Sequence, residues 1–323
     1  MQLDVGIAFF LLGVFATLVR SDIQFPKSLY QSLTLFLMIA IGLKGGVALA
    51  EHASWDLVLQ SFYVILLGLI LPIIAFPILY YVGELKRFDA ASIAAHYGSV
   101  SVGTYAVAVA FLEAQNIEYE AYIPLFVVLL EMPAIAVGLA LAKRSNPAEP
   151  ANSTDVSGES RQELFREVFF NQGMVLMVGG LVIGVVAGDR IARVTPFFFE
   201  LFNGVLALFL LEMGMLAARR LEDIKRVGSF MLAFGIAMPM IGGTIACLLG
   251  VLMGLTVGGT VLLAVLGASA SYIAVPAAMR VALPDANHSL SISSSLGITF
   301  PFNVLIGIPT FIVIAQWMMQ QPL

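Results

Sequence analysis

The chain has 323 residues, of which 60% are hydrophobic and only 11% are charged, and its formal net charge is −5. Soluble domains carry about 25% charged residues, so this chain cannot cover a water-facing surface, which excludes a soluble globular protein and a basic nucleic-acid-binding domain. Its single cysteine and three scattered histidines exclude a disulfide framework and a metal cluster built on those residues.

Apolar runs recur along the chain, and a run of about 17–25 apolar residues is typical of a membrane-spanning helix. The first run has no basic segment before it and no A-x-A site after it, so we expect a retained, short first helix instead of a cleaved signal. The sequence predicts an all-α integral membrane protein with ten transmembrane helices, at about 4–19, 28–50, 55–82, 89–112, 119–143, 167–188, 196–218, 227–253, 258–282 and 289–319.

A polar stretch, "KRSNPAEPANSTDVSGESRQE" (Lys143–Glu163), separates the fifth predicted span from the sixth. Its Pro, Asn, Ser and Glu content cannot pack a core and is typical of a linker. We therefore expect a first five-helix repeat over 1–143, a hydrophilic linker over 144–166 and a second five-helix repeat over 167–323.

Basic residues are distributed unequally between the loops on the two faces. Ten spans put both termini on one face, and the loops of the other face hold 13 of the 16 basic residues. Basic loops stay in the cytoplasm, so we expect the linker inside the cell and both termini outside the cytoplasm. The 13 residues are Arg20, Lys27, Lys86, Arg87, Lys143, Arg144, Arg161, Arg166, Arg219, Arg220, Lys225, Arg226 and Arg280.

The two halves of the chain resemble each other at an offset of about 170 residues. "IGLKGG" (41–46) matches "MGMLAA" (213–218), and "GSVSVGTYAVAVAFL" (98–112) matches "ASASYIAVPAAMRVA" (268–282). The same offset brings Glu131-Met132-Pro133 onto Pro301-Phe302-Asn303. Because each half has an odd number of spans, the second half inserts upside down, and such inverted repeats are typical of secondary transporters.

Small and hydroxylated residues are concentrated in the matching segments 98–112 and 268–282. We expect both helices to break there, near the membrane midplane, with Gly98, Gly103, Gly267 and Pro276 as break points. Breaks expose N–H groups that attract anions, and serine hydroxyls can ligate sodium or donate to an oxyanion. Close helix packing is the alternative, but the equivalent repeat positions favour two crossed, broken helices that hold a small ion.

Two carboxylates lie inside predicted spans. Glu131 stands beside Pro133, and a charge at the bilayer centre costs roughly 2.5–3.5 kcal/mol, so we expect Glu131 to compensate a coupling cation. A protonated or hydrogen-bonded structural glutamate is the alternative. We expect Glu212 to pair with Lys44, although Lys44 could instead extend to the interface or attract an anion.

Other polar residues lead to weaker expectations. Asn287–Asn303 opens the last span with five serines, and some of these should face a cavity or another helix. His96 is expected to make a structural polar contact. The chain lacks HExxH, GxSxG, Walker and nucleotide-binding glycine motifs, so we expect no enzyme.

Three segments resemble the sodium-dependent bicarbonate transporter family known from cyanobacteria: "IGLKGGVAL", "NIEYEAYIPLFVVLLEMPAIAVGLALA" and "SYIAVPAAMRVALPDANHSLSISSSLGITFPFNV". The resemblance implies two inverted five-helix repeats with gate and core domains, similar to the bile-acid sodium symporter fold. It implies homotrimers in the bacterial inner (plasma) membrane that import bicarbonate with sodium as the coupling ion and without a cofactor. A PII-like regulatory protein is a possible cytoplasmic partner of such a transporter.

The same resemblance assigns site residues by position. The substrate positions are Ser99, Ser101, Gly103, Thr104, Ser269, Ala270, Ser271 and Tyr272. The sodium positions are Ser101, Thr104, Glu131, Ser271 and Asn303.

This chain departs from the family pattern at several of these places. "SASYIAVPA" (269–277) has Tyr272 where the pattern has an aspartate, and Glu131 also replaces an aspartate. These differences leave the substrate and the number of sodium sites open. We expect a sodium-coupled bicarbonate symporter. The alternatives are a sodium- or proton-coupled symporter of another small anion, such as an organic carboxylate, and a non-transporting membrane ion sensor.

Overall fold

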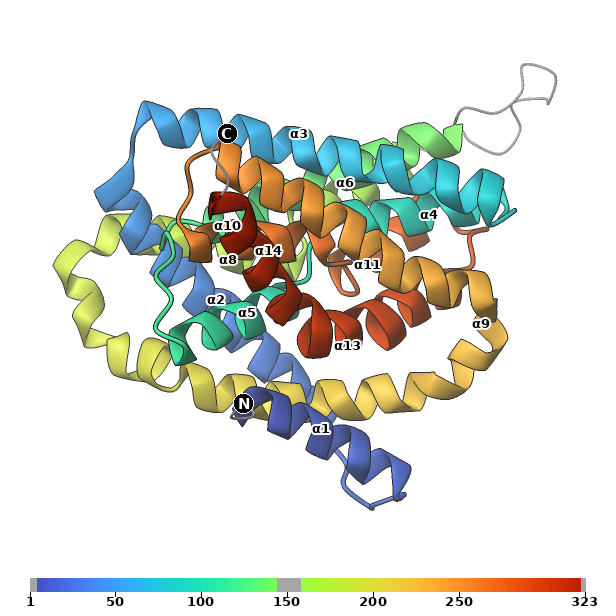
Figure 1. Ribbon diagram of the computed structural model, residues 1–323, viewed down its shortest axis with the longest axis horizontal. Coiled ribbons are helices and arrows are strands. Elements are labelled where there is room, and N and C mark those ends of the chain that lie inside the picture. Colours follow the sequence, from blue (N-terminus) through green and yellow to red (C-terminus); the bar gives the residue numbers. More distant parts are fainter. Residues whose placement is uncertain (1–4, 144–157, 321–323) are drawn as a thin grey trace.

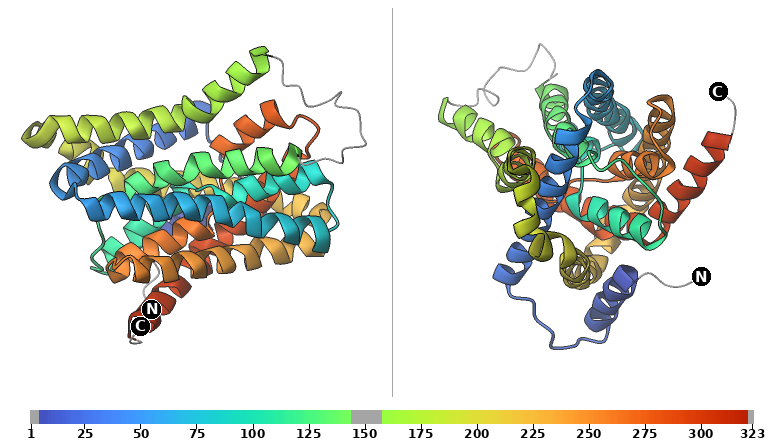
Figure 2. Two further views of the ribbon diagram at one scale, coloured as in Figure 1. Left: turned by 90° about the horizontal axis from the view of Figure 1, so that it is seen from above. Right: turned by 90° about the vertical axis from the view of Figure 1, so that its left-hand side faces the viewer.

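The computed structural model describes residues 5–143 and 158–320, and every regular element in these ranges is a helix (Figure 1). The long helices run side by side along the long axis of the molecule (Figure 2). The expectation of an all-α protein is therefore confirmed for the described residues.

The first half of the chain forms six helices and one π-helical turn. Ser54 begins one of these helices by accepting a hydrogen bond from the Leu57 backbone N–H at 3.2 Å, as an N-cap serine does. The elements are α1 (Val5–Leu18), α2 (Lys27–His52), α3 (Trp55–Pro77), η1 (Ile78–Val82), α4 (Arg87–Gly98), α5 (Val102–Ala114) and α6 (Pro124–Lys143).

The second half contains a long element, α9, which is two helices joined at Gly228. Gly228 has φ 87°, in the region that glycine adopts without steric cost, so the chain turns sharply there. The elements are α7 (Gly158–Phe169), α8 (Gln172–Ala187), η2 (Gly188–Arg193), η3 (Pro196–Glu200), α9 (Phe202–Leu252), α10 (Val257–Ala268), α11 (Ala274–Ala282), α12 (His288–Ile292), η4 (Ser293–Thr299), α13 (Phe300–Phe302), η5 (Asn303–Gly307) and α14 (Ile308–Gln320).

Seven helices in the described ranges are long and apolar enough to cross a membrane, and α7 with α8 forms an eighth candidate bent by 47°. Two shorter apolar helices, α1 and α10, fall on the first and ninth predicted spans. A multi-pass membrane protein is thereby confirmed, while the count of ten spans stays a prediction. Residues 158–166 of the expected linker belong to α7, and residues 144–157 lie outside the described ranges.

Glycines allow helices from opposite halves of the chain to pack very closely. A Cβ added at Gly46 of α2 would lie 2.2 Å from the Leu181 carbonyl oxygen of α8. A Cβ added at Gly214 of α9 would lie 2.1 Å from the Phe10 carbonyl oxygen of α1. Small residues at such crossings are the usual means of helix association in membranes. α2 therefore packs on α8 in the same way that α1 packs on the first limb of α9.

A buried polar network joins α4 to the last span. The Tyr97 hydroxyl is hydrogen-bonded to Ser294 Oγ at 2.6 Å and to Thr299 Oγ1 at 2.7 Å. Thr299 in turn donates to the Gly235 carbonyl of α9 at 2.8 Å. At least two hydroxyls of this span therefore bind other helices, as the sequence predicted for some of them.

Candidate functional site

Two helices are interrupted where the repeat comparison predicted it. α4 ends at Gly98, and residues 99–101 are not helical before α5 begins. α10 ends at Ala268, and residues 269–273 are not helical before α11 begins. The break at Gly98 is confirmed, and the second lies just after Gly267. Gly103 and Pro276 lie inside α5 and α11, so the prediction that they are break points is wrong.

The two breaks are hydrogen-bonded to each other. The Ser271 backbone N–H donates to the His96 carbonyl at 2.9 Å, and His96 Nδ1 bonds the Ser271 carbonyl at 2.6 Å. The Ser101 backbone N–H donates to Ser269 Oγ at 3.0 Å. The expected polar contact of His96 is thus confirmed. These bonds hold segments about 170 residues apart in the sequence in one compact crossing.

The helices that follow the two breaks, α5 and α11, both begin at this crossing. Ser101 caps α5, because its Oγ accepts from the Thr104 backbone N–H at 3.1 Å and from Thr104 Oγ1 at 2.9 Å. α11 starts at Ala274; its N-cap residue Ile273 provides no side-chain hydrogen bond, but Ser271 Oγ accepts from the Val275 backbone N–H at 3.4 Å. Helix N-termini carry partial positive charge, so two positive helix ends lie beside the crossing.

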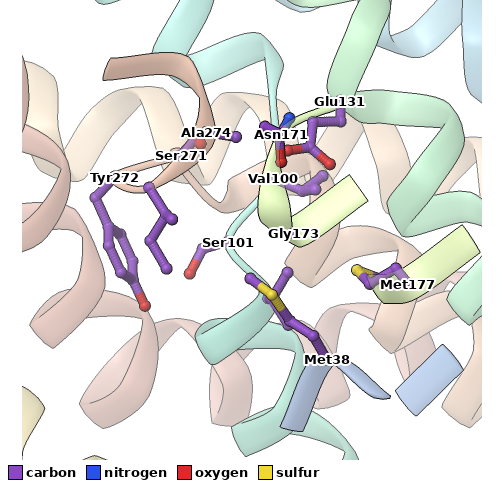
Figure 3. A pocket seen from close by; sticks show the side chains of 12 residues that line it. Met38, Val100, Ser101, Glu131, Asn171, Gly173, Met177, Ser271, Tyr272 and Ala274 are labelled. Carbon is purple, nitrogen blue, oxygen red and sulfur yellow. The ribbon is translucent and has the colours of Figure 1, made fainter. Parts of the chain in front are cut away.

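A small cavity of about 20 Å³ opens between the crossing, α6 and α8 (Figure 3). This volume is room for about one water molecule or a bare monovalent cation. Its polar lining comes from both breaks, from the middle of α6 and from the residue before α8. The lining residues are Met38, Val100, Ser101, Val102, Glu131, Asn171, Gly173, Met177, Ser271, Tyr272, Ile273 and Ala274.

Four of the predicted site residues line this cavity together: Ser101, Glu131, Ser271 and Tyr272. The other predicted residues lie in the crossing, in α5 or in the last span and do not line the cavity; they are Ser99, Gly103, Thr104, Ser269, Ala270 and Asn303.

Two predicted site residues outside the cavity, Asn303 and Ser99, lie close to the crossing and have buried polar atoms. Asn303 Nδ2 donates to the Ala268 carbonyl at 2.8 Å, which ties η5 to the end of α10. Its Oδ1 and the Ser99 Oγ are buried without a hydrogen-bond partner among the described residues. Ser99 and Asn303 therefore each have one buried oxygen, close to the crossing, that makes no hydrogen bond with the described residues.

Asn171 is a lining residue that the sequence reasoning missed. Its Oδ1 accepts from the Met174 backbone N–H at 2.9 Å and caps α8. Figure 3 shows its side chain next to the Glu131 carboxyl group inside the cavity. An Asn before an apolar run is a helix-start signal, so the cap could have been read from the sequence, although its contact with α6 could not.

Lys44 does not pair with Glu212, so that prediction is wrong. Its Nζ lies 3.2 Å from Glu113 Oε1 of α5 and 5.1 Å from the centre of the Phe202 ring. The Tyr119 hydroxyl donates to the same Glu113 oxygen at 2.8 Å. Glu212 is buried, and its Oε2 has no hydrogen-bond partner among the described residues. The carboxylate close to Lys44 is Glu113 at the end of α5. The matching repeat positions of Lys44 and Glu212 gave no indication of this contact.

The hydrogen bonds predict different effects for two matched serine variants. Ser269→Ala leaves the buried Ser101 N–H without its acceptor, so we expect a loss of about 1–3 kcal/mol of stability. Ser99→Ala removes a hydroxyl that has no partner, so we expect unchanged stability. Thermal unfolding of the two purified variants checks this. Equal destabilisation would contradict the crossing described above.

A known protein family matches the part of the sequence that contains the whole site. The sequence model of the Na+-dependent bicarbonate transporter superfamily matches residues 6–316, nearly the whole chain. No curated protein matches the sequence. The matched range contains both breaks and every residue that lines the cavity.

Proposed function

Because the chain belongs to the Na+-dependent bicarbonate transporter superfamily, we propose that it is a secondary transporter that imports bicarbonate together with sodium across the bacterial inner membrane. The observation that carries this proposal is the pair of mutually bonded helix breaks, with two helix N-termini and one buried carboxylate around a shared cavity. Such broken helices at a repeat interface are where secondary transporters bind substrate and coupling ions.

The anion would be held by neutral groups. No basic side chain is among the described residues that line the cavity. The available donors are therefore the hydroxyls of Ser101 and Ser271 and the first-turn N–H groups of α5 and α11 other than those of Thr104 and Val275, which already donate to these two serines. Hydrogen bonds to a charged acceptor are about twice as strong as neutral ones, and a helix N-terminus favours a nearby anion.

The sodium ion would be held by oxygens. Glu131 supplies a carboxylate, and Ser101 and Ser271 supply hydroxyls in the same cavity. Thr104 in α5 and Asn303 in η5, the other two sodium positions implied by the resemblance, lie outside the cavity and would have to move to contact the same ion. The cavity has space for one small ion in this conformation, so binding of bicarbonate in addition requires the lining side chains or the two breaks to move.

The packing of the two halves supports an inverted repeat with a moving core. α1 packs on α9 and α2 packs on α8, and in each pair one helix comes from each half of the chain. α4 and α10 end at Gly98 and Ala268, so the two breaks begin 170 residues apart, which agrees with the proposed repeat. We propose that the crossing moves as a core against a gate. Trimer formation, both termini outside the cytoplasm and a PII-like partner are further proposals that follow from the resemblance.

Uptake of labelled bicarbonate into proteoliposomes tests the function. We expect uptake that requires an inward sodium gradient and fails with a potassium gradient of equal size. Uptake that follows an imposed proton gradient would replace sodium by protons, and competition by acetate with no bicarbonate uptake would indicate a carboxylate symporter. If ions bind but no solute is transported, the protein is an ion sensor and the proposal is wrong.

A further inference from the structure

Tyr272 lines the cavity, and its buried hydroxyl group makes no hydrogen bond of standard geometry. It lies in the break between α10 and α11 and lines the cavity with Ser101 (Figure 3). Its hydroxyl oxygen is buried and makes no hydrogen bond of standard geometry with the described residues, although the Ser101 side chain lies close enough to interact with it. A buried tyrosine hydroxyl normally finds a partner, so a ligand is the reasonable candidate for this one.

The surroundings hold this phenol ring in place. The Phe300 ring packs against the Tyr272 ring edge to face, with centroids 5.7 Å apart. A Cβ added at Gly103 of α5 would lie 2.4 Å from the Tyr272 hydroxyl and 2.9 Å from the Phe209 ring. The absence of a side chain at Gly103 therefore provides the space into which the phenol reaches.

The charges around the cavity indicate which ligand the hydroxyl serves. Glu131 is the ionisable acid among the described lining residues, and no lysine or arginine lines the cavity. A cation in this cavity could bind to the Glu131 carboxylate, whereas an anion could accept hydrogen bonds only from neutral donors. A tyrosine at neutral pH is a neutral donor, so its hydroxyl complements the anion and adds no second negative charge for a second cation.

We propose that Tyr272 is a specificity-determining residue of the transported anion, whose hydroxyl donates to one oxygen of a small monovalent oxyanion of the bicarbonate or carboxylate class. The Ser101 hydroxyl lies beside the same oxygen of the anion, and Gly103 leaves the space that the phenol group of Tyr272 occupies. Sodium binds independently of Tyr272 through Glu131. This inference rests on the proposed function, because it concerns the anion of that same site.

Tyr272→Phe in the full-length, detergent-purified protein is the direct test, since it removes only the hydroxyl. Bicarbonate, acetate and nitrate are titrated by calorimetry at saturating sodium, and sodium is titrated without anion. We expect anion affinity to fall by at least about tenfold and sodium affinity to stay within about twofold. Tyr81→Phe, at an exposed position of η1, is the matched control and should change neither affinity.

Gly103→Ala provides a second, independent variant. The added methyl group displaces the phenol, so we expect the same loss of anion affinity. Combined with Tyr272→Phe, it should cost little more, because both changes remove one interaction. Tyr272→Phe should change the unfolding temperature of the ligand-free protein little, because its hydroxyl makes no hydrogen bond of standard geometry and only neighbours the Ser101 side chain.

Each other outcome overturns a specific statement. Unchanged anion affinity in Tyr272→Phe overturns the role of Tyr272 and leaves the proposed function intact. An equal loss of sodium and anion affinity overturns it as well, since the residue would then support the whole site. If the wild type binds acetate but not bicarbonate, the proposed substrate is wrong, and acetate then tests Tyr272. If it binds none of the three anions, both proposals are wrong.

Discussion

Glu131→Gln is expected to abolish sodium-driven uptake, with sodium affinity reduced by at least about a hundredfold. Glu131 is buried and is the one carboxylate among the described residues that line the cavity. Removing one partner of a buried charge pair costs about 3–5 kcal/mol, which corresponds to more than a hundredfold in affinity. Sodium-dependent thermal stabilisation and proteoliposome uptake measure the two effects separately.

The glutamine variant keeps the size and hydrogen-bonding capacity of the side chain. It also removes a charge that is costly within a bilayer, so the ligand-free variant should be at least as stable as the wild type. Glu212→Gln is the matched control, because Glu212 is equally buried but does not line the cavity. If both variants retain sodium-dependent stabilisation, Glu131 is a structural residue held by Asn171, and the coupling site lies elsewhere.

The two helix breaks could be predicted from the sequence, because a break depends on local composition and because the two halves of the chain show matching segments there. Gly98 and Ala268 end their helices 170 residues apart, and the offset was visible as paired serines. The cost of a charge in an apolar helix singled out Glu131 without any structural knowledge. Local chemistry and the repeat comparison therefore predicted two helix breaks and a carboxylate that line one cavity.

Contacts between elements could not be predicted in the same way. The neighbour of Glu131 is Asn171, which lies in the bend between α7 and α8, and the position of this bend depends on tertiary packing. Lys44 meets Glu113, because a long side chain takes the nearest carboxylate in three dimensions. Gly103 was read as a break point, although it is a helical residue whose missing side chain makes room for Tyr272.

Gly214→Ala is expected to cause a large loss of stability, because position 214 of α9 packs directly on the backbone of α1. Its new Cβ would lie 2.1 Å from the Phe10 carbonyl oxygen and 3.0 Å from the Val14 backbone N. These are backbone atoms of a packed helix, which cannot rotate away as a side chain does. Overpacking of this kind typically costs about 1–3 kcal/mol, and α1 must separate from α9 to relieve it.

Gly204→Ala on the same element separates close packing from helix propensity. Nothing lies within 4 Å of its added Cβ, and alanine favours a helix over glycine by about 0.5–1 kcal/mol, so this variant should be as stable as the wild type or more stable. Gly46→Ala and Gly179→Ala repeat the comparison at the crossing of α2 and α8, with 2.2 Å to the Leu181 carbonyl oxygen and with open space. Thermal unfolding in detergent should show both crowded variants destabilised and both open ones unaffected. Loss at only one crossing would mean that the two halves do not contribute equivalent contacts, which would remove the packing argument for an inverted repeat.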